Sequence, residues 1–217
     1  KPATWFDVDH KGLAKILERR GKEFVVFELL SNCFDTKAKT ITVTLEKHAG
    51  SPKASLWVED DDPDGFGNLT HAFTLFAPST RAADSDRRGR FNLGEKLVLA
   101  VCYEATITTT TGTVTFNETG RHARRASREH GSVFHGVVRM TTQEHEDVCK
   151  AVGKILVPES ISVTFNGKVL PSRKPLRELP RVYLPTVQAD DEGFLKRCYR
   201  ATTLHVYEPV PGEPAML

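Results

Sequence analysis

Three polar side chains share one stripe of an otherwise apolar helical segment. Glu28, Asn32 and Asp35 stand at positions i, i+4 and i+7, which an α-helix brings into line on one face. Most of their neighbours are apolar, so we expect a buried helix from about Lys22 to Thr36. A buried carboxylate costs several kcal/mol unless a partner compensates it. The stripe indicates a cavity that holds a cation or polar ligand, or else a helix with one solvated edge.

An acidic segment that contains a glycine comes next. A strand expected over residues 54–59 leads into the run Asp61-Asp62-Pro63-Asp64-Gly65. The carboxylates are hydrogen-bond acceptors, and the glycine allows another group to approach the backbone closely. Taken alone, such a run is also typical of a solvated acidic turn.

A second glycine-containing run precedes an apolar helix. It reads Gly89-Arg90-Phe91-Asn92-Leu93-Gly94-Glu95-Lys96. If the helix starts at Gly94, the first backbone N–H groups can face phosphate oxygens, and Lys96 can add a positive charge. The alternative is an ordinary connection between a loop and a helix that carries a surface lysine.

These motifs, in this order, resemble those of the GHKL ATPases, the family of gyrase, the large heat-shock chaperones, MutL and histidine kinases. The resemblance covers roughly residues 5 to 170 and includes Gly131-Ser132-Val133 at the start of a strand. It implies a Bergerat-type fold that binds and hydrolyses ATP with Mg²⁺. In that family, ATP turnover drives a conformational change in a longer protein.

The resemblance implies a role for each residue of the helix motif. Glu28 matches the glutamate that polarises the attacking water, and Asn32 matches the asparagine that coordinates Mg²⁺. Asp35 matches the acidic residue that supports the nucleotide pocket. Histidine kinases usually carry asparagine where this chain has Glu28, so the glutamate favours hydrolysis over phosphotransfer.

The resemblance also implies the contacts of the adenine base. In the family pattern Asp-x-Gly-x-Gly, Asp61 would accept a hydrogen bond from the adenine amino group, with Asp60 as the alternative if the register shifts by one. Gly65 would let the backbone approach the base, although Pro63 replaces the first glycine and has no N–H to donate. Ser132 falls where the family has a threonine on the adenine side.

The phosphates would be bound by the second glycine run, which resembles the lid motif of the family. Its contacts would come from Gly89, Leu93, Gly94 and Lys96, and residues 78–90 would form a mobile lid. Asn92 replaces the middle glycine of the motif, and asparagine is the residue that best tolerates positive φ after glycine.

Composition narrows the class of protein. The 217 residues suit one sizeable domain or a domain plus an extension, and a net charge of +2 implies no bulk attraction to nucleic acid. The basic residues at 121–128 have no aromatic platform beside them. No membrane span or signal peptide is visible, and the scattered cysteines lack metal-ligand spacing, so we expect a cytoplasmic protein with reduced thiols.

The order of expected elements predicts an α+β two-layer sandwich, with a mixed sheet and helices packed on one face. The ATP-binding domain would span residues 1–170. Residues 171–217, rich in proline and arginine, would be an extension or the start of another region of a longer protein. Local signals include a capping box at Thr141 and Glu144, and a hairpin turn at Asn166-Gly167.

Other functions remain open from the sequence alone. They are a nucleotide sensor without turnover, a phosphotransferase of the histidine-kinase kind, and an interaction domain that has lost its site. The expected ligands are ATP and Mg²⁺, and a homodimer is possible in the full-length protein.

Overall fold

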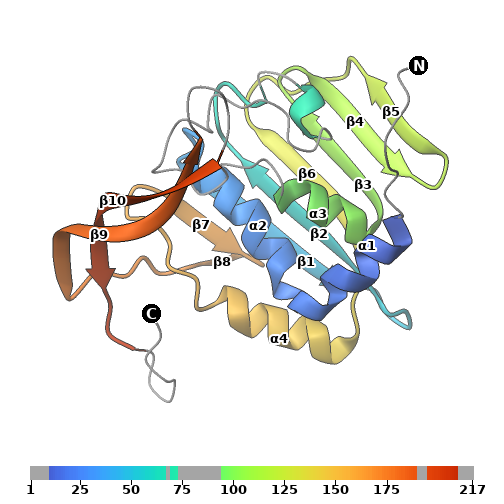
Figure 1. Cartoon of the computed structure of the whole chain (residues 1–217). Coiled ribbons are helices and arrows are strands. Elements are labelled where there is room, and N and C mark those ends of the chain that lie inside the picture. The colour runs from blue at the N-terminus through green and yellow to red at the C-terminus, as the bar shows by residue number, and fades with distance from the viewer. Residues whose placement is uncertain (1–9, 67–68, 73–93, 190–194, 210–217) are drawn as a thin grey trace.

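The computed structural model describes residues 10–66, 69–72, 94–189 and 195–209. Within these residues the chain forms an eight-stranded sheet, a separate two-stranded sheet and four α-helices. The helices lie on one face of the large sheet (Figure 1). The predicted α+β architecture is therefore confirmed.

The large sheet is mixed, and its strand order is β5-β4-β3-β6-β2-β1-β7-β8. β1 pairs in parallel with β7, while the other pairs are antiparallel. The strands are β1 (Thr40–Lys47), β2 (Lys53–Asp60), β3 (Cys102–Thr109), β4 (Gly112–Asn117), β5 (Gly120–Arg124), β6 (Ser132–Arg139), β7 (Ser162–Phe165) and β8 (Lys168–Val169). The separate sheet consists of β9 (Arg177–Ala189) and β10 (Leu195–Val206).

The central strands alternate between core and solvent. In β1 the inward residues Ile41, Val43 and Leu45 are at most 2% exposed. In β2 the inward row runs through Leu56 and Val58 at intervals of two residues. Because side chains of a strand alternate between its two faces, this row continues to the last residue of β2.

The helical layer is built around α2 (Glu23–Phe34). It contacts α3 (Gly94–Val101), α4 (Thr142–Val152) and β2, and its buried residues pack into the core. The expected buried helix is therefore present. Ahead of it lie α1 (His10–Leu17) and a short 3-10 helix (Glu18–Arg20) that ends at Gly21 with φ of 83°.

Two local predictions are confirmed in full. Thr141 and Glu144 form a reciprocal capping box at the start of α4. Asn166 and Gly167 both have positive φ, 46° and 78°, in the turn between β7 and β8. This pair of left-handed residues is what a two-residue hairpin requires.

Other elements differ from the expectations. The helix expected to continue to Cys102 ends at Val101, and Cys102 begins β3. The basic connection at 121–130 contains the edge strand β5, whose residues are all exposed and so show no alternation. β9 was not expected, because Pro180 and Pro185 oppose strand formation. It tolerates them because, within the described residues, it pairs only with β10, and Pro180 lies where the register between the two strands shifts.

Two further observations concern the helices and the expected lid. None of the described helices is both long and apolar enough to cross a membrane. The chain forms a short 3-10 helix at Leu69–Ala72, and the expected lid at 78–90 lies outside the described residues.

Candidate functional site

Helix α2 carries the polar stripe along a half-buried edge. Its fully packed face is apolar, whereas Glu28, Asn32 and Asp35 are each of intermediate exposure. Asp35 is the C-cap residue, and the hydroxyl of Thr36 donates to the carbonyl of Cys33 at 2.7 Å to close the last turn. The stripe thus faces neither the dry core nor open solvent, as a ligand-binding edge would require.

Asp60 is the charged end of an apolar row. It follows Leu56 and Val58 on the inward face of β2 and is only 9% exposed. Burial raises the pKa of its carboxyl to about 6, although hydrogen bonds from the backbone N–H groups of Asp62 and Ser132 act in the opposite direction. A buried carboxyl that titrates near neutrality is a common feature of functional sites.

The surroundings of Asp60 come from three elements. From α2, the thiol of Cys33 lies 4.0 Å from Asp60 Oδ2. From β6, Ser132 pairs with Asp60 across the strands, and its hydroxyl donates to Thr109 Oγ1 on β3 at 3.2 Å. Ser132 therefore lies beside Asp60 of the acidic segment.

Asp61 has a different environment. Its Oδ1 accepts hydrogen bonds from the backbone N–H groups of Lys39 at 2.7 Å and Thr40 at 2.9 Å. Partial burial acts to raise the pKa of this carboxyl, but the hydrogen bonds from Thr40 and Lys39 outweigh it and lower the pKa. The Asp61 carboxylate thus holds the start of β1 and is not placed in the row that Asp60 ends.

Two glycines allow close packing of the acidic loop. Gly65 has φ of 54°, and a Cβ there would lie 2.5 Å from Thr109 Oγ1. Gly131 has φ of 71°, and a Cβ there would overlap the carbonyl oxygen of Asp60. Gly65 was expected to make room for a bound base, and in the structure it also makes room for Thr109.

Thr109 was not predicted from the sequence as a residue of the site. It is fully buried, and its hydroxyl oxygen accepts hydrogen bonds from Ser132 Oγ and from the backbone N–H of Phe66 at 2.7 Å. It continues the inward row of Ala105 and Ile107 in β3. A polar residue at the end of that alternation was the signal that could have found it.

The second glycine run is described only in part. Gly94 is the first residue of α3, as expected, and α3 packs against α2. The side chain of Lys96 is outside the description, and Gly89 and Leu93 precede the described part of the run. Their contacts with phosphate stay predictions.

The polar residues discussed so far lie near the C-terminal half of α2. Cys33, Asp60, Ser132 and Thr109 form a polar group at one place, and Asn32 directly precedes Cys33. Glu28 lies about 6 Å nearer the N-terminus along the helix axis, at 1.5 Å per residue from Asn32. The arrangement provides hydrogen-bond acceptors for a base at one end and polar groups for a charged group further along the helix.

A family model described as histidine kinase-, DNA gyrase B-, and HSP90-like ATPase matches residues 20–152, more than half of the chain. The chain belongs to this ATPase family. The matched segment holds the polar stripe of α2, the acidic loop and the start of β6, so the GHKL resemblance of the sequence is confirmed. No curated protein sequence matches the chain.

A solved structure with a similar fold contains the ATPase and transducer domains of DNA topoisomerase II from Balamuthia mandrillaris. Sequence identity is 19%, and the TM-score is 0.48. The similarity covers 69% of this chain and 48% of that chain, so this chain spans about half the length of that structure.

Asn32 of α2 could offer an oxygen ligand to a bound metal ion such as Mg²⁺. The side-chain amide of Asn32 stands on the half-buried edge of the helix, one turn from Glu28. Such oxygen donors suit Mg²⁺, which takes its other ligands from nucleotide phosphates and water. Among the described residues, no group of three or more His, Cys, Asp or Glu side chains is arranged to hold a metal ion.

Proposed function

We propose that this chain binds ATP with Mg²⁺ and hydrolyses it, and that turnover drives a conformational change in a longer protein. The observation that carries the proposal is Asp60, a buried carboxyl with a raised pKa beside Cys33 of α2, the helix that carries the polar stripe. Because domains of this ATPase family bind ATP, we take ATP to be the ligand beside Asp60.

Adenine would lie at the Asp60 end of the site. We assign to Asp60, in place of Asp61, the hydrogen bond from the adenine amino group. Two observations support the assignment: Asp60 is buried on the inward row of β2 beside Cys33 and Ser132, whereas the Asp61 carboxylate lies off that row and bonds the start of β1. Ser132 would take part through its hydroxyl, and Gly65 would keep the loop close to the base.

The phosphates would lie along α2 toward Glu28. Asn32 would hold Mg²⁺, which neutralises phosphate charge when bound, and Asp35 would support the pocket at the end of the helix. Glu28 would orient and deprotonate the attacking water. Gly89, Leu93, Gly94 and Lys96 would bind phosphate oxygens through backbone N–H groups and the lysine charge.

Glu28 separates hydrolysis from binding. Glu28→Ala should reduce phosphate release by about 10²–10⁴-fold, the usual cost of losing a general base, and leave ATP affinity nearly unchanged. The measurement is steady-state phosphate release beside an equilibrium titration of the same preparation. Glu46→Ala, at an exposed carboxylate of β1, is the matched control.

The outcomes distinguish the candidate functions. Binding without turnover in the wild-type full-length protein would favour a nucleotide sensor. Transfer of labelled phosphate to the protein would favour a phosphotransferase. Full turnover by Glu28→Ala would remove Glu28 from the catalytic role.

A further inference from the structure

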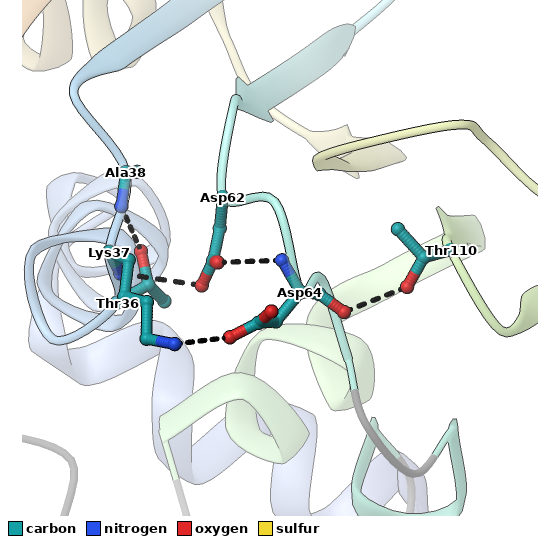
Figure 2. A network of polar contacts seen from close by, with 6 residues as sticks. All are labelled: Thr36, Lys37, Ala38, Asp62, Asp64 and Thr110. Carbon is teal, nitrogen blue, oxygen red and sulfur yellow. Dashed lines mark hydrogen bonds and ion pairs between the residues drawn. The ribbon is translucent and has the colours of Figure 1, made fainter.

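The carboxylate of Asp62 ties the acidic loop to the connection between α2 and β1. Its Oδ2 accepts from the backbone N–H of Lys37 at 3.4 Å, and its Oδ1 accepts from the backbone N–H of Asp64 at 3.0 Å. Figure 2 shows this carboxylate between the two segments. Asp62 is only 6% exposed, so these bonds are shielded from solvent.

The backbone of Asp62 connects the same residue to Asp60 and to β6. Its N–H donates to Asp60 Oδ1 at 2.9 Å. Its carbonyl accepts from Gly65 N–H at 3.1 Å and from Gly131 N–H at 2.9 Å. Asp62 therefore joins the buried aspartate, the turn of the loop and the residue before Ser132.

The outer edge of the loop is held separately. Lys37 Nζ lies 2.5 Å from Asp64 Oδ2, and Thr110 Oγ1 donates to the Asp64 carbonyl at 2.8 Å (Figure 2). The side chains of Lys37 and Asp64 are 73% and 63% exposed, so solvent screens their attraction. The Asp64 side chain thus belongs to the surface, whereas that of Asp62 belongs to the interior.

With Asp60 as the first residue of the family pattern Asp-x-Gly, Asp62 stands at the first glycine. A glycine at this position could still donate through its N–H and accept through its carbonyl. It could not make the two side-chain bonds to Lys37 and Asp64. In this chain a carboxylate therefore fixes a loop segment that the pattern leaves to glycine.

We propose that Asp62 is a positioning residue for nucleotide binding, whose carboxylate holds the loop so that the Asp62 N–H remains bonded to Asp60. The inference rests on the proposed ATP site. Loss of the carboxylate would loosen the loop, and Asp60 would be presented to the base less accurately.

The pH dependence of nucleotide binding reports on this arrangement, because Asp60 must be ionised to accept fully. Asp60 is faced by the Asp61 and Asp62 carboxylates of its own loop, by the Cys33 thiol from α2, and by the backbone N–H of Ser132 from β6. The hydrogen bond from Asp62 N–H lowers the pKa of Asp60 more than the charge of Asp62 raises it. A loosened loop should therefore raise the pKa of Asp60, whereas simple removal of the charge should lower it.

The test uses Asp62→Gly and Asp62→Asn, with Asp64→Asn as the control that removes a carboxylate from the outer edge. Affinity for a non-hydrolysable ATP analogue with Mg²⁺ is measured from pH 5 to pH 8. Asp62→Gly should weaken binding about tenfold at pH 8, which corresponds to the loss of a buried hydrogen bond. Its acid midpoint for binding should move to higher pH, and Asp64→Asn should match the wild type.

Asp62→Asn removes the charge but keeps one acceptor oxygen, so it should weaken binding at pH 8 less than Asp62→Gly does, and it serves if Asp62→Gly does not fold. An unchanged or lowered midpoint in folded Asp62→Gly, or wild-type affinity at pH 8 in a folded Asp62 variant, would overturn the proposal. Absence of binding by the wild type would instead contradict the proposed function itself, so the two failures are distinguishable.

Discussion

Asp60 and Asp61 are neighbours in the sequence, but their side chains enter different regions of the molecule. Asp60 enters the buried region between α2, β2 and β6, where its pKa is raised to about 6. Asp61 turns to the rim at the start of β1, where backbone N–H groups of Lys39 and Thr40 lower its pKa. Asp60 is therefore a candidate ligand contact, whereas the carboxylate of the next residue, Asp61, makes structural hydrogen bonds.

The end of the strand decides which residue of this acidic run is buried in the core. β2 continues to Asp60, and its inward row of Leu56 and Val58 passes to that residue. A carboxylate on this row replaces an apolar side chain in the core. Burial of that kind is retained where a ligand or a hydrogen-bond network compensates it.

Gly131→Ala should disrupt the packing around Asp60 and cause the largest loss of stability. A Cβ at Gly131 would overlap the Asp60 carbonyl, whereas one at Gly50, which has a similar positive φ of 66°, would meet nothing within 4 Å. Both substitutions strain the backbone, but only one also displaces β2. We expect Gly131→Ala to lower the free energy of unfolding by about 3 kcal/mol more than Gly50→Ala. Chemical denaturation measures both, and equal losses would show that the approach to Asp60 is unimportant.

Acidification should stabilise the free protein while weakening its binding of nucleotide. Asp60 has a raised pKa, so the folded state binds more protons than the unfolded state between its unfolded value near 3.8 and about 6. The contribution of Asp60 to the free energy of unfolding therefore rises as pH falls, by about 2 kcal/mol between pH 7 and pH 4.5. Asp61 contributes stability that is lost only as pH falls through its lowered pKa, below this window.

Asp60→Asn provides the control for that prediction. Denaturation curves of the variant should lose the increase in stability between pH 7 and pH 4.5, because the titrating group is gone. A wild-type stability that falls steadily over this window, or a variant with the same profile as the wild type, would contradict a buried ionisable Asp60.

Local patterns predicted most of the domain. Ile41, Val43 and Leu45 alternate with polar residues, which indicates the strand β1. Apolar surroundings located α2, and Thr141 with Glu144 located the start of α4. β5 could not be found in this way, because it is an exposed edge strand without alternation. β9 could not be found either, because its prolines oppose strand formation. They are tolerated because β9, among the described residues, pairs only with β10.

The motifs of the candidate site could be predicted from the sequence more fully than the contacts between its residues. Glu28 and Asn32 lie on one half-buried edge, as the helical spacing indicated. The choice between Asp60 and Asp61 depended on where β2 ends, and the expected strand stopped one residue too early. The hydrogen bonds of Thr109 join segments far apart in the sequence, and no local pattern reports such contacts.

The most direct test of the account is a paired titration of Asp60→Asn and Asp61→Asn with a non-hydrolysable ATP analogue and Mg²⁺. The wild type should bind saturably. Asp60→Asn should bind about 5- to 150-fold more weakly, since an amide donor facing the adenine amino group costs roughly 1–3 kcal/mol. Asp61→Asn keeps an oxygen for Lys39 and Thr40, so its affinity should match the wild type. Weak binding by Asp61→Asn with normal binding by Asp60→Asn, or no binding by the wild type, would contradict the account.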